Sequence, residues 1–405
     1  MASVKMRLII MNFLQFFIWG AWLITIANYW FGTKHWESDS FGMVFMTLGI
    51  SSIFMPTLMG IVADRWINAE KLFGILHILG GISVFGLTLA NTPNQFFWVM
   101  LTAMIFYMPT IALTNTISYN ALKKGGLDVV KDFPPIRVWG TIGFIAAMWT
   151  TNLSGNKATE YQFYISAVSA VILGFYSFSL PKCPPQVSTT EKSSFAELFG
   201  LDAFKLLANY KMAIFFIFSM LLGAALQLTN MYGDVFLDEF KFVEIYADSF
   251  VVRYSTIIMS ISQISETVFI LAIPFFLKRF GIKNVMLISM FAWVLRFGLF
   301  SFGNPGDMLW MIIISNIIYG MAFDFFNISG SLFVETQVDS KIRASAQGLF
   351  MMMTNGFGAI IGALGSGMII KTFFIQANGE KDWQGIWLTF SIYALVVTIA
   401  FALLF

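Results

Sequence analysis

Long runs of apolar residues, broken by only a few polar positions, recur from one end of the chain to the other. About 20 apolar residues in a helix cross the roughly 30 Å hydrocarbon layer of a bilayer. A search for runs of about that length predicts twelve membrane-spanning helices. Their ranges are 6–31, 41–63, 70–91, 95–121, 138–153, 160–180, 211–237, 250–277, 284–302, 308–333, 343–373 and 384–405.

Two of these runs have unusual lengths, and a polar stretch divides the set in the middle. The run 138–153 is short for a full crossing, so its helix should begin earlier, inside the segment FPPIR. The run 343–373 is long and is expected to end near Ile370. The polar stretch from Leu180 to Phe204 reads as a linker. We therefore predict two six-helix halves, 1–180 and 211–405, joined by a linker over 181–210.

Composition agrees with this pattern and excludes a soluble protein. The 405 residues are 58% hydrophobic and 11% charged, with a mean hydropathy of +0.77. Most of the 24 Lys and Arg fall in loops on the side of the N-terminus, which predicts that both termini are cytoplasmic. This topology already explains the net charge of +2, so no nucleic-acid partner is expected. Cys183 is the only cysteine, which excludes an intrachain disulfide. The first apolar run lacks a cleavage site and is interpreted as a retained helix.

Polar residues inside three predicted spans of the second half are the first candidates for chemistry. Gln263 and Glu266 stand three residues apart and share one helix face, with Ser262 and Ser265 nearby. The same spacing relates Asp324 to Asn327 and Gln227 to Asn230. Such residues can join helix to helix by hydrogen bonds. Carboxylates in the hydrocarbon, however, cost about 2.5–3.5 kcal/mol or more and usually mark substrate or proton pathways.

The first half offers a cation and aromatic rings. Arg137 and Thr141 lie four residues apart, and Phe144 follows close to one turn later. Arg137 either extends to the cytoplasmic surface or lies at the foot of a cavity, where it would meet polar groups of a substrate. Phe144, Tyr319 and Phe323 stand close to these polar positions and could stack on a flat ligand.

A second pair of charges suggests a proton site. Arg296 lies alone in the apolar run MFAWVLRFGLF, and Asp324 lies in the following span. One hypothesis is a switch, in which a nearby Arg296 favours the ionised carboxylate and releases its proton, whereas separation of the pair favours proton uptake. The alternative is a static buried pair.

Longer segments point to a family. IRVWGTIGF and IRASAQGLF begin corresponding spans of the two halves, and GIVADRW resembles the loop signature of the major facilitator superfamily. FLQFFIWGAWL, KDFPPIRVWGTIGF, STIIMSISQISET, AFDFFNISGS and IRASAQGLFMMMTNGFG closely resemble the bacterial nucleoside:proton symporters of that superfamily. The resemblance covers nearly the whole chain.

The resemblance implies proton-driven nucleoside uptake across the bacterial inner membrane by alternating access, in a monomer that uses protons and no other cofactor. The family's nucleoside-binding pattern carries over to nine positions: Arg137, Thr141, Phe144, Gln227, Asn230, Gln263, Glu266, Tyr319 and Phe323. In this interpretation Glu266 and the amides bind ribose hydroxyls, and the three aromatic rings contact the base.

Three other functions remain open from the residues alone. A proton-coupled sugar or oligosaccharide symporter would use similar carboxylates and an aromatic platform. A membrane-embedded enzyme is not expected, because the chain has only His35 and His77 and no metal or nucleophile constellation. A sensor that binds without transporting would carry the same binding residues.

Overall fold

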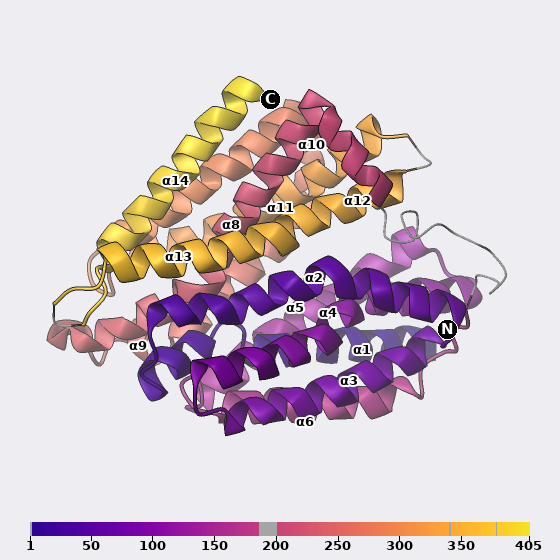
Figure 1. Cartoon of the computed structure of the whole chain (residues 1–405), viewed down its shortest axis with the longest axis horizontal. Coiled ribbons are helices and arrows are strands. Elements are labelled where there is room, and N and C mark those ends of the chain that lie inside the picture. The colour runs from indigo at the N-terminus through magenta and orange to yellow at the C-terminus, as the bar shows by residue number, and fades with distance from the viewer. Residues whose placement is uncertain (1, 186–200, 340–341, 378) are drawn as a thin grey trace. The chain divides into compact units, whose positions relative to one another are not determined.

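The computed structural model describes residues 2–185, 201–339, 342–377 and 379–405, and these ranges are almost entirely helical. Part of the predicted linker, residues 186–200, lies outside the described residues. Eight of the described helical segments are long and apolar enough to span a membrane. Each of the predicted spans coincides with a helical segment (Figure 1), so the prediction of an all-helical membrane protein is confirmed.

Helical segments of the first half follow the first six predicted spans. The fifth helix begins at Val129, well before the apolar run, as the short run required. The first span is interrupted, because α1 ends at Gly20 and a turn separates it from the π-helical residues Asn28–Thr33. The segments are α1 (Ala2–Gly20), η1 (Asn28–Thr33), α2 (Ser38–Arg65), α3 (Ala69–Gly86) with η2 (Leu87–Leu89), α4 (Pro93–Lys124), α5 (Val129–Leu153) and α6 (Tyr161–Ser177).

The last six spans contain two local departures from simple helices. The eighth and ninth spans join in α10, but Gly281 has φ 74° and ψ 170°, a backbone conformation that glycine adopts most easily, so it marks the turn between two helices. The eleventh span consists of α12, the π-helical η6 and α13. The segments are η3 (Leu201–Ala208), α8 (Tyr210–Glu239), η4 (Phe240–Phe242), η5 (Glu244–Tyr246), α9 (Phe250–Arg253), α10 (Ser255–Phe302), α11 (Leu309–Gln337), α12 (Arg343–Met351), η6 (Met352–Gly358), α13 (Ala359–Phe373) and α14 (Trp383–Leu404).

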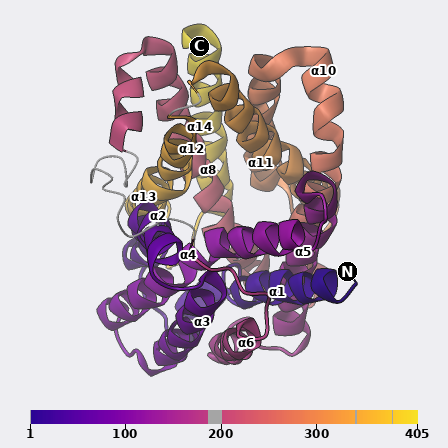
Figure 2. The same ribbon diagram turned by 90° about the vertical axis from the view of Figure 1, so that its right-hand side faces the viewer.

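The chain forms two compact units whose cores are built separately. Unit 1 comprises 1–34 and 50–199, and unit 2 comprises 35–49 and 200–405, so the first part of α2 belongs to unit 2. In unit 1, α1 packs mainly on α5 and α6, and α3 packs on α6 and α4 (Figure 2). In unit 2, α10 packs on α11 and α14, and α8 packs on η6 and α13.

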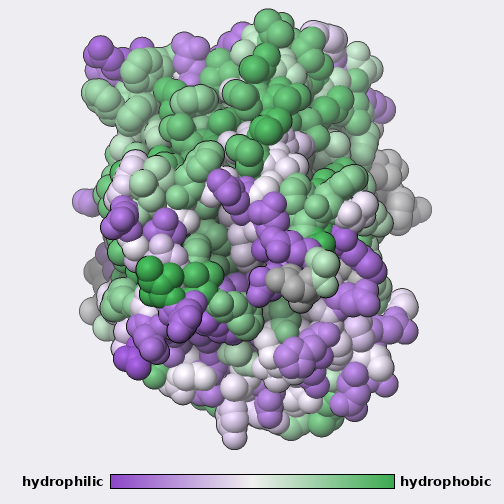
Figure 3. Space-filling view, turned by 90° about the vertical axis from the view of Figure 1, so that its left-hand side faces the viewer, coloured by the Kyte–Doolittle hydropathy of each residue, from purple (hydrophilic) through white to green (hydrophobic). Residues whose placement is uncertain are grey.

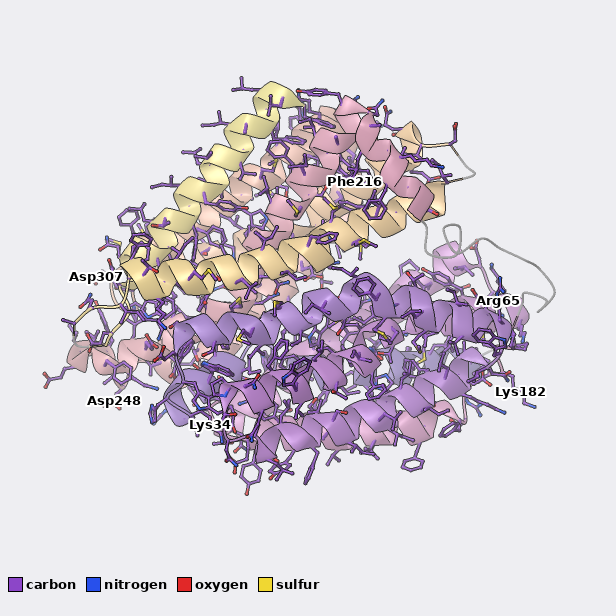
Figure 4. The ribbon with its side chains drawn as sticks, viewed as in Figure 1. Lys34, Arg65, Lys182, Phe216, Asp248 and Asp307 are labelled. Carbon is purple, nitrogen blue, oxygen red and sulfur yellow. The ribbon has the colours of Figure 1, made fainter. Side chains whose placement is uncertain are left out.

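Charged and apolar residues are distributed as a bilayer requires. In unit 1, Arg65 and Lys182 lie at one end of the helices and Lys34 lies at the opposite end (Figure 4). In unit 2, Asp248 and Asp307 lie together at one end of that unit's own helices (Figure 4). Large apolar side chains are exposed, Leu271 and Leu403 by 80% each. Hydrophobic residues cover broad areas of the face in Figure 3. Such exposure is expected where lipid replaces water as the solvent.

Candidate substrate and proton site

The predicted residues of unit 1 lie on α5 where that helix meets α1. The Arg137 guanidinium stacks over the Phe16 ring, with its central carbon 4.0 Å from the ring centroid, and Arg137 and Thr141 are both half-buried. Phe144 is 8% exposed, and its ring meets the Trp19 ring edge to face at 6.5 Å. The three predicted residues therefore share a face with α1 aromatics.

Glycine allows α1 and α5 to come this close. A Cβ atom added to Gly20 would lie 2.5 Å from the carbonyl oxygen of Phe144. A Cβ atom on Gly140 would lie 2.6 Å from Nη1 of Arg137 and 2.7 Å from the Phe16 ring. Small residues commonly permit such close helix packing in membranes. Gly20 and Gly140 therefore allow the close packing of α1 on α5 that positions Arg137 and Phe144.

Four predicted residues of unit 2 lie around Tyr319: Phe323, Glu266, Arg296 and Asp324. Tyr319 is 5% exposed and lies within electrostatic range of Glu266, Arg296 and Asp324. The Phe323 ring stacks almost parallel on the Tyr319 ring, at 5.9 Å and 11°. Tyr319 therefore contacts the predicted aromatic surface and lies within electrostatic range of both acids and of Arg296.

Contacts between α10 and α11 hold Glu266 in place. Ser262 Oγ donates to Asn316 Oδ1 at 2.8 Å, and the Ser265 hydroxyl donates to the carbonyl oxygen of Ile317. A Cβ atom on Gly320 would lie 2.6 Å from the backbone nitrogen of Glu266. The serines noted in the sequence therefore connect the helices, as polar residues often do in membranes, and Glu266 itself is half-buried beside them.

Two amide side chains of unit 2, one on α8 and one on α10, have unused acceptors. Gln227 is 6% exposed, and its Oε1 has no hydrogen-bond partner among the described residues; the same holds for Oε1 of Gln263. Asn230, which lies three residues after Gln227 on the same predicted helix face, is half-buried. A buried acceptor without a partner costs about 1–3 kcal/mol, and a substrate that donates hydrogen bonds would remove that cost.

Arg296 is fully buried and makes contacts that the sequence did not indicate. Its Nη1 donates to the Ser315 carbonyl at 2.7 Å and its Nε donates to Thr229 Oγ1 at 3.3 Å. Its guanidinium lies 4.7 Å from the Tyr319 ring centroid. Arg296 and Asp324 both lie within electrostatic range of Tyr319. Asp324 is 5% exposed.

Sequence reasoning missed Trp19, Phe16 and Thr229 as neighbours of the site. No spacing or composition in the sequence indicated these three residues, because their contacts with the predicted residues arise only when distant helices pack together. Within the described residues no group of three His, Cys, Asp or Glu residues could hold a metal ion.

Comparison with known proteins gives these groups a context. A family model described as "Nucleoside H+ symporter" matches residues 2–405. The chain belongs to the nucleoside–H+ symporter family. This family consists of transporters, so the chain is a transporter and not an enzyme.

Individual permeases match over nearly their whole length. Nucleoside permease NupG of Escherichia coli is 51% identical over 100% of this chain and 96% of its own. Xanthosine permease of the same organism is 50% identical over 98% of this chain and 95% of its own. A crystal structure of nucleoside transporter NupG superposes with a TM-score of 0.92 and covers 99% of this chain and 98% of that one. The fold of this symporter is therefore that of the major facilitator superfamily.

Proposed function

We propose that the chain carries nucleosides together with protons across the inner membrane and into the cell. The observation that carries this proposal, beyond family membership, is the group around Tyr319 in unit 2. This group provides an aromatic surface and two acids, and two amides of the same unit have acceptor atoms without a hydrogen-bond partner among the described residues. A nucleoside offers a flat base and vicinal ribose hydroxyls, which match these features.

Nine residues would bind the substrate. Glu266, Gln263, Gln227 and Asn230 would accept from or donate to ribose hydroxyls, and the charge of Glu266 would make its hydrogen bonds the strongest. Tyr319, Phe323 and Phe144 would contact the base. Arg137 and Thr141, on the same helix as Phe144, would bind polar atoms of the nucleoside.

Asp324 would carry the coupled proton. It is buried and interacts electrostatically with Tyr319, over which Arg296 lies. We propose that the proton is released when Arg296 comes closer to Asp324 and is taken up when the two move apart. Tyr319 would then contact the nucleobase and also interact electrostatically with the acid that carries the proton.

The remaining properties follow from this assignment. Transport would proceed by alternating access, with the binding site open to one side of the membrane at a time. The protein would act as a monomer with both termini in the cytoplasm. Protons would be the coupling ion, with no other cofactor.

The test uses purified protein in proteoliposomes. Labelled uridine should exchange in counterflow, and unlabelled uridine or adenosine should compete while lactose should not. An inward proton gradient should drive accumulation of uridine. Competition by lactose but not by nucleosides would instead favour the sugar symporter, and binding without flux would favour a sensor.

A further inference from the structure

Trp19 lies at the C-terminal end of α1, beside two buried aromatic residues of unit 1, Phe144 and Tyr107. Its ring lies 6.5 Å from the ring of Phe144, edge to face, and 5.7 Å from the ring of Tyr107. The tight α1–α5 contact at Gly20 adjoins it directly. Trp19 is half-buried, so part of its ring is accessible while part is packed.

The indole nitrogen of Trp19 is unsatisfied. Its Nε1 is buried and has no hydrogen-bond partner among the described residues. Indole N–H is a donor only, and a buried donor without an acceptor carries a desolvation cost. Buried tryptophans usually find an acceptor for this group. An acceptor that arrives with a ligand would meet this requirement.

The polar groups near Trp19 are hydrogen-bonded to one another. The Tyr107 hydroxyl donates to the backbone carbonyl of Gln15 at 2.7 Å. The side chain of Gln15 is used at both ends, since Oε1 meets His77 Nε2 at 2.7 Å and Nε2 donates to Thr110 Oγ1 at 2.8 Å. These contacts hold the groups next to Trp19 in a closed network. None of these groups accepts a hydrogen bond from Trp19 Nε1.

We propose that Trp19 is a further specificity residue, whose Nε1–H donates to an acceptor atom of the nucleobase. This inference rests on the proposed function, because it assigns a base contact beside Phe144. Nucleobases carry carbonyl oxygens and ring nitrogens that accept hydrogen bonds. The ribose hydroxyls are already assigned to Glu266 and the amides of unit 2, so they do not require Trp19. The residue would thus distinguish bases by the acceptors that they present.

Trp387 offers a matched control. Its Nε1 is also buried without a hydrogen-bond partner among the described residues, and the side chain is fully buried. It lies on α14 in an aromatic cluster of unit 2 with Phe297 and Phe300. Trp387→Phe therefore removes the same unpaired N–H at a position with no role in the proposed binding.

The experiment measures binding by calorimetry to the wild type, Trp19→Phe and Trp387→Phe. The ligands are uridine and two uridine analogues, each lacking one of the two base carbonyl oxygens. Trp19→Phe should weaken uridine binding by about threefold to tenfold, the range expected for one hydrogen bond. The loss should vanish for the analogue that lacks the accepting oxygen. Trp387→Phe should leave all three affinities unchanged.

Other outcomes would overturn the inference. If Trp19→Phe binds all three ligands like the wild type, or loses affinity equally for all of them, Trp19 does not contact a base carbonyl. If Trp19→Phe does not fold, the wild type still decides, because one analogue must bind about threefold to tenfold more weakly than uridine and equal binding contradicts the assignment. If the wild type binds no nucleoside, the proposed function fails as well, which separates the two cases.

Discussion

The two units each bury a polar cluster, and the clusters differ in how fully their hydrogen bonds are used. The cluster of unit 1 consists of Gln15, His77, Tyr107 and Thr110, and it is called here the closed network. In unit 2, Glu266, Arg296 and Asp324 lie within electrostatic range of Tyr319. These four residues, taken together with the amides Gln227 and Gln263 of the same unit, are named the open cluster.

The closed network pairs its groups with one another. His77 and Gln15 are joined at 2.7 Å, Gln15 and Thr110 at 2.8 Å, and the Tyr107 hydroxyl donates to the Gln15 carbonyl at 2.7 Å. All four side chains are at most 6% exposed. They join α1, α3 and α4, so their hydrogen bonds connect helices of unit 1.

The open cluster retains hydrogen-bonding capacity. Oε1 of Gln227, Oε1 of Gln263 and Nη2 of Arg296 have no partner among the described residues. Both of its acids lie within electrostatic range of Tyr319. Buried polarity alone therefore does not identify a functional site in a membrane protein. The useful distinction is whether the groups satisfy one another or leave atoms available to a substrate or a proton.

The largest expected effect comes from removing the titratable group of the open cluster. Asp324→Asn should abolish proton-driven accumulation of uridine, because an amide cannot carry the proton. Counterflow and binding should persist, because the amide keeps the size and polarity of the side chain. Uptake in proteoliposomes with and without an inward proton gradient separates these effects. Uphill accumulation by the variant would exclude Asp324 and leave Glu266 as the leading proton carrier.

Breaking the closed network should affect stability and leave transport chemistry intact. Gln15→Leu removes both side-chain hydrogen bonds and leaves His77 and Thr110 without this partner. We expect a loss of about 1–3 kcal/mol in unfolding free energy, measured by denaturation in detergent, with unchanged uridine affinity. Thr110→Val removes the hydrogen bond accepted from Gln15 and the one donated to the Tyr107 carbonyl. It keeps the bond between Gln15 and His77 and should therefore cost less. Loss of affinity without loss of stability would place Gln15 in the binding site.

Phe144→Ala should have a smaller effect, confined to the base. An aromatic contact contributes about 0.5–1.5 kcal/mol beyond the area it buries, so uridine affinity should fall by several-fold. The affinity for free ribose should not change, because the ring contacts only the base. Equal inhibition of uptake by free ribose and by uridine in the wild type would contradict any stacking role.

The smallest effect concerns the segment after α6. Cys183 is 4% exposed, and its backbone N–H donates to Glu70 Oε2 at 2.7 Å. Burial, reinforced by the negative charge of Glu70, raises the pKa of the Cys183 thiol. The thiol should therefore stay protonated at neutral pH and react slowly with maleimide, and faster as the pH rises. Glu70→Ala should speed labelling, and labelling of the folded wild type as fast as in denaturant would be inconsistent with this anchoring.

The fold could be predicted from the sequence, whereas the contacts among the candidate residues could not. Helix positions followed from apolar runs, because only satisfied backbones cross a bilayer. Acids in those runs were conspicuous, because their burial is costly. The stacking of Arg296 on Tyr319, the neighbourhood of Trp19 and the closed network depend on the packing of distant helices. Local spacing cannot report such pairings, and Gln15 and His77 looked unremarkable in the chain.

The central claim is that the open cluster binds the nucleoside, and Glu266 tests it most directly. Calorimetry should compare uridine binding to the wild type and to Glu266→Gln, with unfolding measured on the same samples. The predicted result is a loss of about 1.5–3 kcal/mol in binding free energy, because a charge-assisted acceptor is replaced by a neutral one, with little change in stability. Unchanged uridine affinity in a folded Glu266→Gln protein would contradict the account.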